Sequence, residues 1–150
     1  MNELHLFAGC GGGVLAGKLI GHRAIGYVER ESYRCRTLAQ RIKDGILDDA
    51  PIYCGTVREF IDGGYARLHC GLVDVLCAGF PCTSFSLAGK RLGGDDPRNG
   101  WPETIDAIRI IKPRFAFLEN VPGLITHPYF QTICGDLQES GYRIRVTVLG

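Results

Sequence analysis

Three groups of side chains in this sequence combine residue types and positions that are suited to chemistry. They are a glycine-rich turn at 9–13, a cysteine that follows a proline at Cys82, and an acid that ends an apolar segment at Glu119. Glycine lets the backbone approach a ligand closely, a thiolate is a strong nucleophile, and a carboxyl group can hold or donate a proton. The sequence therefore predicts a cofactor site beside a nucleophile and a proton donor.

The glycine-rich turn carries the cofactor prediction. Phe7-Ala8-Gly9-Cys10-Gly11-Gly12-Gly13 connects a strand-like segment to a helix-like one, and N–H groups at a helix N-terminus can bind a ligand. Glu29 ends the next strand-like segment, 20 residues after Gly9, where an acid can accept hydrogen bonds from ribose hydroxyls. This arrangement predicts a nucleoside cofactor without distinguishing NAD from S-adenosylmethionine. A ligand-free glycine turn with a surface glutamate is the alternative.

A second turn follows the third strand-like segment. Thr56 and Val57 lie there, where an Asp or Asn would be expected to contact an adenine. The Thr56 hydroxyl could make a weaker contact of this kind, and Val57 could pack on the ring. A loop threonine with no ligand is an equally open interpretation.

Cys82 lies in a segment from 80 to 100 with little secondary-structure signal. A loop of that length in a compact domain is usually functional or disordered. Cys82 follows Pro81 at the end of a strand-like segment, where a helix N-terminus and nearby cations would lower the pKa of the thiol. Lys90, Arg91 and Arg98 could pair with phosphates or remain solvated charges. A structural role for Cys82 also stays open.

The cysteine count restricts the other kinds of site. The sequence has 7 cysteines, at positions 10, 35, 54, 70, 77, 82 and 134. An odd number with no C-x-x-C pair argues against a disulfide framework and a structural zinc site. We therefore expect no metal, and we interpret most of these cysteines as small buried hydrophobes in a reducing compartment.

Glu119 ends the apolar segment that begins at Arg114. We expect this acid to be buried, and desolvation would then raise its pKa so that it can hold or donate a proton. A glutamate that only caps the following turn is the alternative. If the two strands are neighbours, Cys82 and Glu119 lie at the same edge of the sheet.

The elements that must position these groups alternate along the chain. Strands are predicted at 4–8, 24–29, 51–54, 72–78, 114–119 and 142–149, and helices at 12–20, 31–42, 57–61, 101–111 and 129–139. Gly21 and Gly141 are predicted to end helices in a left-handed conformation. The alternation is typical of an α/β fold with a doubly wound, mostly parallel sheet. Ligands of such sheets bind outside the carboxyl ends of the strands.

Composition and charge exclude several classes of protein. The chain is 45% hydrophobic and 22% charged, as in soluble globular proteins, and its 150 residues suit one domain. The 17 basic and 16 acidic residues give a net charge of +1, so any contact with nucleic acid must come from local clusters. No signal peptide and no apolar run of roughly 18–20 residues is present. We expect a cytoplasmic protein with no membrane partner.

Taken together, these residues resemble a known family. The matching motifs are Leu6-Phe7-Ala8-Gly9-Cys10-Gly11-Gly12, Gly79-Phe80-Pro81-Cys82 with Phe85-Ser86 and Ala88-Gly89-Lys90, and Glu119-Asn120-Val121. In order and spacing, the chain is similar to the amino-terminal half of the catalytic domain of DNA (cytosine-5) methyltransferases. The resemblance implies a Rossmann-like methyltransferase fold, S-adenosylmethionine as cofactor, and double-stranded DNA with a target cytosine as partner. It also implies a bacterial or phage-encoded protein.

The resemblance implies a mechanism on a cytosine flipped out of the duplex. Cys82 would add to C6 and make C5 nucleophilic. Glu119 would hydrogen-bond the N3 edge, and Asn120 would help to position the loop. C5 would take the methyl group, and loss of the C5 proton and of Cys82 would release 5-methylcytosine.

The resemblance also implies binding residues. The cofactor would contact Phe7, Ala8, Gly9, Gly11, Gly12, Glu29, Thr56, Val57 and Pro81. Ser84, Ser86, Lys90 and Arg91 would lie against DNA phosphates, and we add Arg98 from the same loop.

The sequence departs from the family in four respects. His5 replaces the acid before Leu-Phe, Thr56 replaces the acid of the third motif, and Thr83 replaces the glutamine after the cysteine. The fourth is that Gly150 precedes the family's arginine motif, target recognition domain and final helix. Residues 1–150 are therefore expected to be the S-adenosylmethionine-binding portion of an incomplete catalytic domain. We find no segment in this sequence to which reading of the base sequence in the DNA grooves can be assigned.

Several alternatives stay open at this point. The chain could be a truncated or decayed remnant without activity, or one half of a split enzyme whose complementary subunit supplies DNA recognition. RNA in place of DNA as the substrate is a further alternative. An NAD oxidoreductase would leave Cys82 and Glu119 unexplained. The sequence does not distinguish restriction–modification from phage protection or regulation.

Overall fold

The structure is a computed structural model that describes residues 1–81 and 99–148. Its centre is a sheet of five strands in the order β3-β2-β1-β4-β5, with every neighbouring pair parallel. The strands are β1 (Asn2–Leu6), β2 (Arg23–Glu29), β3 (Ile52–Cys54), β4 (Val75–Ala78) and β5 (Phe115–Leu118). The chain adds β2 and β3 on one side of β1, then β4 and β5 on the other. The prediction of a doubly wound parallel α/β sheet is confirmed.

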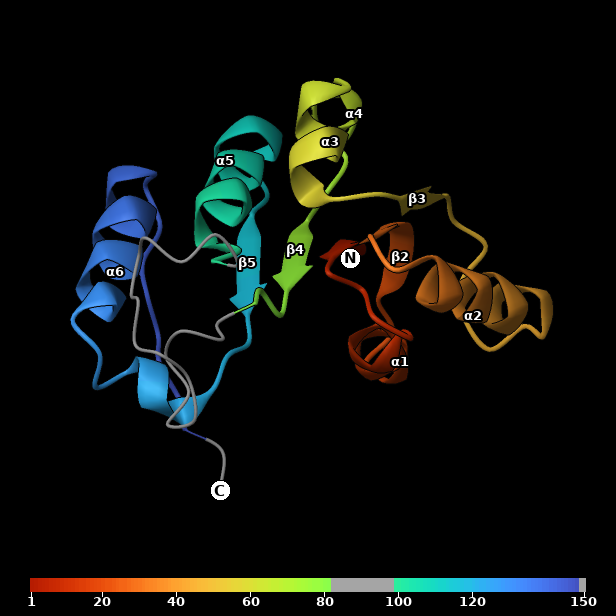
Figure 1. The fold of residues 1–150 in the computed structure, drawn as a ribbon, viewed down its shortest axis with the longest axis horizontal. Coiled ribbons are helices and arrows are strands. Elements are labelled where there is room, and N and C mark those ends of the chain that lie inside the picture. The colour runs from red at the N-terminus through yellow and green to blue at the C-terminus, as the bar shows by residue number, and fades with distance from the viewer. Residues whose placement is uncertain (82–98, 149–150) are drawn as a thin grey trace.

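Helices lie on both faces of the sheet (Figure 1). The helices are α1 (Gly12–Leu19), α2 (Ser32–Lys43), α3 (Val57–Asp62), α4 (Tyr65–Leu68), α5 (Trp101–Ile111) and α6 (Tyr129–Glu139), with a 3-10 turn η2 (Pro122–Leu124). The sheet separates two apolar cores. Leu4 and Leu6 of β1 pack in the larger core with α3, α4, α5 and α6. Tyr27 of β2 packs in the smaller core with Val14 of α1 and Leu38 of α2.

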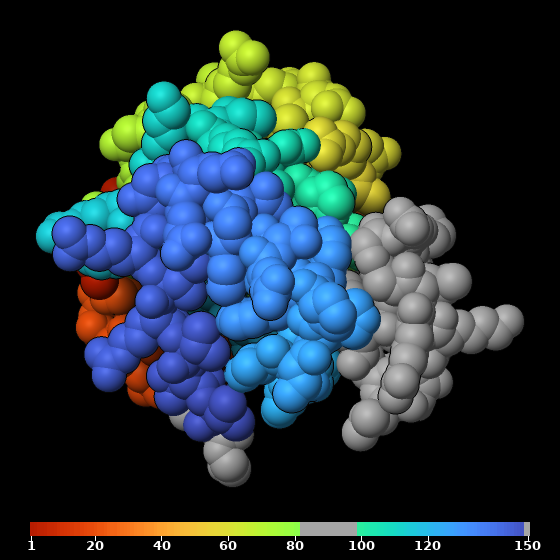
Figure 2. Space-filling view, turned by 90° about the vertical axis from the view of Figure 1, so that its left-hand side faces the viewer, coloured from red at the N-terminus to blue at the C-terminus, as the bar shows by residue number. Residues whose placement is uncertain are grey.

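The helices on the larger core are stacked side by side. α5 contacts α3, α4 and α6, and Figure 2 shows α6 in blue in front of α5, with the yellow α3 beyond them. The buried apolar residues of α5 include Ile105, Ile108 and Ile111, the helical spacing that the sequence predicts.

The predicted elements correspond closely to the observed ones up to residue 139. α5 and α6 have the predicted bounds, α1 and α3 each differ by one residue at the C-terminal end, and α2 is shifted by one residue at both ends. Gly21 and Gly141 have φ of 78° and 88°, so both left-handed helix ends are confirmed. The helix α4 and the turn η2 carry no strong periodicity and were not predicted.

The predicted strand at 142–149 is wrong for the residues that the structure describes, since 142–148 form no strand. Two of the four alternating apolar residues of this segment pack on the core instead of pairing with β5, and the other two, Val146 and Val148, are exposed. Tyr142 and Ile144 lie against the larger core, and the Tyr142 hydroxyl donates to the Pro113 carbonyl over 2.6 Å. Alternation of apolar and polar residues by itself indicates only an extended chain with one buried side. A strand also needs a neighbouring strand with which it forms hydrogen bonds.

The register of the sheet brings the strand ends together. Leu6 of β1 is paired with Val28 of β2 and Ala78 of β4, and Ala78 is paired with Leu118 of β5. The residues that follow these strands therefore leave the sheet at one edge. Within residues 1–81 and 99–148, no helix has the length and apolar character needed to cross a membrane.

Candidate active site

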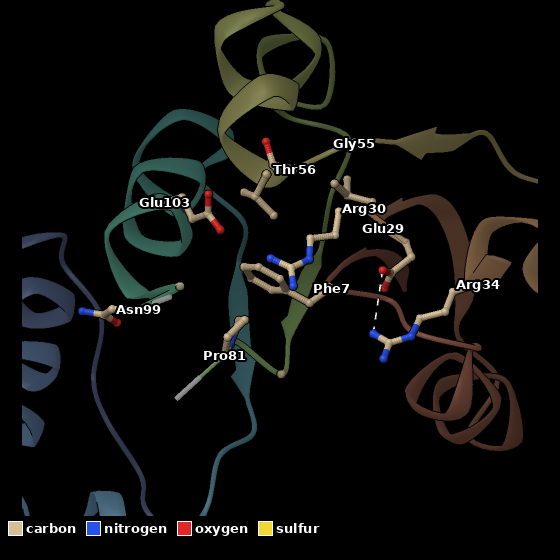
Figure 3. Close-up of a pocket in the computed structure, with 13 residues that line it drawn as sticks. Phe7, Glu29, Arg30, Arg34, Gly55, Thr56, Pro81, Asn99 and Glu103 are labelled. Carbon is tan, nitrogen blue, oxygen red and sulfur yellow. Dashed lines mark ion pairs between the residues drawn. The ribbon is translucent and has the colours of Figure 1, made fainter. Parts of the chain in front are cut away.

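A cavity of about 300 Å³ lies at this edge of the sheet (Figure 3). The residues around it come from the ends of β1, β2 and β4, from the turn before α3, from α2 and from the start of α5. They are Phe7, Val28, Glu29, Arg30, Arg34, Gly55, Thr56, Val57, Gly79, Pro81, Asn99, Gly100 and Glu103. Five predicted cofactor residues are in this set, namely Phe7, Glu29, Thr56, Val57 and Pro81.

Glu29 joins the glycine-rich turn to the end of β2. Its carboxylate is buried and accepts hydrogen bonds from the Gly9 N–H over 2.8 Å and from the Glu31 N–H over 2.9 Å. Arg34 Nη1 lies 3.9 Å from the same carboxylate. A carboxylate has about four lone-pair sites, so Glu29 keeps acceptor capacity for a ligand beside its two backbone donors. The interpretation as a mere surface glutamate is wrong.

The glycine-rich turn is held by hydrogen bonds within it and to β2. The N–H of Ala8 donates to the Val28 carbonyl over 3.0 Å, and the N–H of Gly11 donates to the Ala8 carbonyl over 3.0 Å. Gly11 has φ of 88°, and a Cβ there would lie 2.9 Å from Leu47 Cδ1, so only glycine fits. Phe7 is the residue of the turn that lines the cavity, and the lining does not include the predicted cofactor residues Ala8, Gly9, Gly11 and Gly12.

The opposite wall is packed so tightly that a glycine is required. A Cβ on Gly100 would lie 2.6 Å from Pro81 Cδ and 3.2 Å from Phe7 Cζ. The Gly100 N–H also donates to the Pro81 carbonyl over 3.2 Å. Pro81 and Gly100 flank residues 82–98 in the sequence, and the structure brings these two flanks together at the cavity. Cys82, Thr83, Ser84, Ser86, Lys90, Arg91 and Arg98 lie outside the described residues.

Thr56 lines the cavity and also begins α3. Its hydroxyl accepts from the Glu59 N–H over 3.1 Å and donates to Glu59 Oε2 over 2.9 Å, and the Thr56 N–H donates to the same carboxylate over 2.8 Å. These hydrogen bonds form a capping box and lower the pKa of Glu59. Thr56 therefore has a structural role that the sequence left open, and Val57 is mostly buried in the core.

Three charged residues at the cavity were not predicted from the sequence. Arg30 follows Glu29 directly, Arg34 lies on α2, and Glu103 lies in the first turn of α5; all three line the cavity (Figure 3). Burial raises the pKa of Glu103, against the opposing effect of the Arg58 N–H, which donates to Glu103 Oε2 over 3.1 Å. The only signal for them in the sequence is proximity to Glu29 and to the loop that ends at Gly100.

Glu119 and Asn120 fasten the end of β5 to the end of β4. The Glu119 N–H donates to the Ala78 carbonyl over 3.0 Å, and Asn120 Nδ2 donates to the Phe80 carbonyl over 3.1 Å. A Cβ on Gly79 would lie 3.0 Å from Glu119 Oε2. The Glu119 side chain therefore lies beside the residues that lead into Cys82, as expected for neighbouring strands.

The predicted burial of Glu119 is wrong, because the residue is exposed. Among the described residues β5 is one of the two edge strands of the sheet, and Phe115 and Phe117 on it are also exposed, at 47% and 66%. The apolar composition of β5 predicted burial on both faces, but within residues 1–81 and 99–148 no helix buries the face that carries Phe115 and Phe117.

Comparison with known proteins agrees with this geometry. The family model described as C-5 cytosine-specific DNA methylase matches residues 1–150. The chain is 34% identical over 148 residues to the Type II methyltransferase M.AplI of Arthrospira platensis, covering 97% of this chain and 39% of that protein. It is 35% identical over 137 residues to the Type II methyltransferase M.NgoMIV of Neisseria gonorrhoeae, covering 91% of this chain and 40% of that protein.

Solved structures show the same fold. A protein assigned as a DNA modification methyltransferase, encoded within an Escherichia coli prophage, matches with a TM-score of 0.69 and 24% identity over 92% of this chain and 37% of that one. A protein of Pyrococcus horikoshii assigned as an RNA methyltransferase matches with a TM-score of 0.60 and 14% identity, covering 93% of this chain and 58% of that one. The chain spans 39% and 40% of the length of the two curated relatives.

Proposed function

The chain belongs to the C-5 cytosine-specific DNA methylase family, and we propose that it is the cofactor-binding and nucleophile-bearing part of an enzyme that methylates C5 of cytosine in DNA. The observation that carries the proposal is the junction between β4 and β5. The Asn120 amide holds the Phe80 carbonyl, two residues before Cys82, and Glu119 lies beside Gly79 at the same place. We propose that this junction brings Cys82 and Glu119 together next to the cavity.

The cavity has the features that a nucleoside cofactor requires. Its volume of about 300 Å³ is at the lower end of the range of ligand pockets. Phe7 offers an aromatic surface, and Glu29 offers carboxylate lone pairs for ribose hydroxyls. S-adenosylmethionine supplies an electrophilic methyl group when bound. We propose that Glu29 and Phe7 hold the nucleoside part, with Pro81 closing the side nearest to Cys82.

We propose that the chain's own residues activate the base as follows. The Cys82 thiolate forms a bond to C6 of a cytosine flipped from the duplex, and the electron pair of the C5–C6 double bond becomes available at C5. Glu119 takes up a proton as the flipped base covers it, donates a hydrogen bond to N3 and stabilises the adduct, and Asn120 fixes the loop that carries Cys82. After methylation, loss of the C5 proton returns the electron pair and releases Cys82.

The DNA contacts belong to the same proposal. We assign Ser84, Ser86, Lys90, Arg91 and Arg98 to the phosphates beside the flipped base. The names of the curated relatives, Type II methyltransferases of bacteria, favour duplex DNA over RNA and a place in restriction–modification. We therefore place the reaction in the cytoplasm of a bacterium.

A second proposal is that these 150 residues need a further polypeptide segment for DNA recognition, on the same chain or on a complementary subunit. The specific observation in its favour is the uncovered face of β5, where Phe115 and Phe117 are 47% and 66% exposed. Exposed aromatic residues of this kind mark a surface that another element covers. The chain would then bind cofactor alone and transfer methyl groups only when completed.

One experiment tests both proposals. The chain and its Cys82→Ser variant are titrated with S-adenosylmethionine by calorimetry and assayed for transfer of labelled methyl to duplex DNA and to tRNA, alone and fused to the remaining part of M.AplI. We expect cofactor binding by both proteins and transfer to DNA only by the fusion with Cys82. Cys70→Ser, at an exposed position, is the matched control. Transfer that survives Cys82→Ser would refute the mechanism.

A trapping assay tests the covalent step itself. Fluorine at C5 of the target cytosine cannot leave as a proton does, so the adduct to Cys82 would persist after methylation. We expect a DNA–protein band that resists denaturant for the fusion and for its Cys70→Ser variant. If the Cys82→Ser fusion formed the same band, another residue would be the nucleophile.

A further inference from the structure

A buried polar cluster on the other face of β1 has no part in the proposed reaction. Glu3 and His5 of β1 are 4% exposed each, and His5 Nε2 lies 2.9 Å from Glu3 Oε2. His22, in the turn between α1 and β2, places Nδ1 2.5 Å from Glu3 Oε1. Cys77 of β4 is the partner of His5 in the sheet register. The cluster thus joins β1, β4 and the turn after α1.

The fold makes room for the charged member of this cluster. α1 passes over Glu3 at Gly17, and a Cβ on Gly17 would overlap the Glu3 carboxylate. The ion pairs that the structure gives Glu3 are both with imidazoles, those of His5 and His22. An imidazole balances a carboxylate only while it carries a proton. A buried carboxylate without a lasting positive partner is destabilising.

The donor atoms are close enough to share one ion. One ligand atom each from Glu3, His5 and Cys77 lie within 4.8 Å of one another. Tetrahedral zinc, with bonds of roughly 2.0–2.3 Å, separates its ligand atoms by about 3.4–3.6 Å. Small side-chain rotations would therefore bring the three atoms onto one ion. Nitrogen, oxygen and sulfur donors together suit zinc better than magnesium or calcium, which take oxygen.

We propose that Glu3, His5 and Cys77 form a binding site for a borderline-soft divalent cation, Zn²⁺ or a metal of similar preference. His22 is a positioning residue, because it holds the second oxygen of the Glu3 carboxylate. One carboxylate and one thiolate balance the charge of a divalent ion, so the occupied site is neutral, as a buried site requires. A water completes the coordination.

The site ties together the two strands that lead to the active site. His5 and Cys77 each stand one residue before the end of their strand, and the next residues along lead to Phe7 and to Pro81. Our expectation of no metal rested on the absence of local spacing such as C-x-x-C. The ligands proposed here come from positions 3, 5 and 77, so only the pairing of β1 with β4 brings them together.

The test uses the reduced, chelator-treated chain with zinc and cobalt as probes and needs no enzyme activity. We expect one Zn²⁺ per chain by calorimetry, and with Co²⁺ an absorption band from thiolate-to-metal charge transfer. Cys77→Ser should abolish the band and weaken zinc binding at least about 100-fold. His22→Gln should weaken it about 10- to 100-fold, as loss of an outer hydrogen bond does. Cys54→Ser, at an exposed cysteine, should leave both unchanged.

Three results would overturn the proposal. They are the absence of saturable zinc binding by the wild-type chain, a cobalt–thiolate band that survives Cys77→Ser, and loss of the band in Cys54→Ser. Far-ultraviolet circular dichroism checks that each variant is folded. If Cys77→Ser does not fold, His5→Gln replaces it, and the wild-type cobalt spectrum still decides whether a thiolate binds the metal.

Discussion

Replacing Glu29 by glutamine separates the two roles that the structure gives this side chain. The carboxylate accepts from the N–H groups of Gly9 and Glu31, and it faces the cavity with its remaining lone pairs. Glutamine keeps one acceptor oxygen and presents an NH₂ group where the second N–H needs an acceptor. One charge-assisted hydrogen bond is lost, and a part-buried N–H is left without a protein partner.

The magnitude follows from these contacts. A hydrogen bond to a charged group contributes about 1.5–3 kcal/mol, and an unsatisfied buried donor costs about 1–3 kcal/mol. The lost hydrogen bond and the unsatisfied N–H donor describe largely the same change, so the two costs are not added. We therefore expect the free energy of unfolding to fall by about 2–3 kcal/mol. Weaker ribose contacts should also reduce the affinity for S-adenosylmethionine about 10- to 100-fold, as loss of about 1.4–2.8 kcal/mol implies.

Urea denaturation measures the first effect, and calorimetric titration with S-adenosylmethionine measures the second. Glu31→Gln is the matched control, because the side chain of Glu31 is 42% exposed and its ion pair within the described part of the chain is with the exposed Arg30. Its free energy of unfolding should change by less than about 0.5 kcal/mol. If Glu29→Gln proved as stable as Glu31→Gln, the structural role would be wrong. If its cofactor affinity were unchanged, the assignment of the ribose site would be wrong.

Three further substitutions test other parts of the structure. Thr56→Ala removes the capping box of α3 and should lower the free energy of unfolding by about 1 kcal/mol in urea denaturation; no loss would show that the box is not formed in solution. Gly17→Ala should destabilise by about 1–3 kcal/mol because its Cβ overlaps the Glu3 carboxylate, whereas Gly13→Ala, which meets nothing within 4 Å, should be neutral or stabilising by up to about 1 kcal/mol. Equal stabilities of these two variants would contradict the packing of α1. Burial raises the pKa of Glu103 above the ordinary 4.5, so the folded chain binds more protons there than the unfolded chain, and the stability of the wild type relative to Glu103→Gln should fall as the pH rises from 4 to 7. A difference that is constant across this range, or that grows in favour of the wild type, would contradict the effect of burial.

Most secondary structure could be predicted because it depends on neighbours in the sequence. The isoleucines at 105, 108 and 111 fix a buried helix face, and Gly21 and Gly141 end helices because their left-handed φ suits glycine. The strand predicted at 142–149 failed for the opposite reason. Its alternation is real, but pairing depends on a partner strand, and Tyr142 and Ile144 pack on the core instead.

Some residues of the candidate site could likewise be predicted from the sequence, and others could not. The glycine turn, Glu29 and the segment leading to Cys82 were found from residue type and position, and Glu29, Phe7 and Pro81 do meet at one cavity. Arg30 and Glu103 were missed because they are 73 positions apart in the sequence, and each taken alone is an ordinary surface charge. The exposure of Glu119 was missed because it depends on which strand is outermost.

The sequence by itself determined the α/β alternation, the turn that approaches a ligand, and the family to which the chain belongs. These are local properties, since backbone preference, apolar periodicity and short motifs are written within a few residues. Only the tertiary structure decided that β1 lies between β2 and β4. That order places Glu29 behind the glycine turn, Asn120 on the carbonyl of Phe80, and Cys77 beside His5 and Glu3. Such contacts join residues far apart in the chain, so they depend on how the strands pair and on which faces the helices cover.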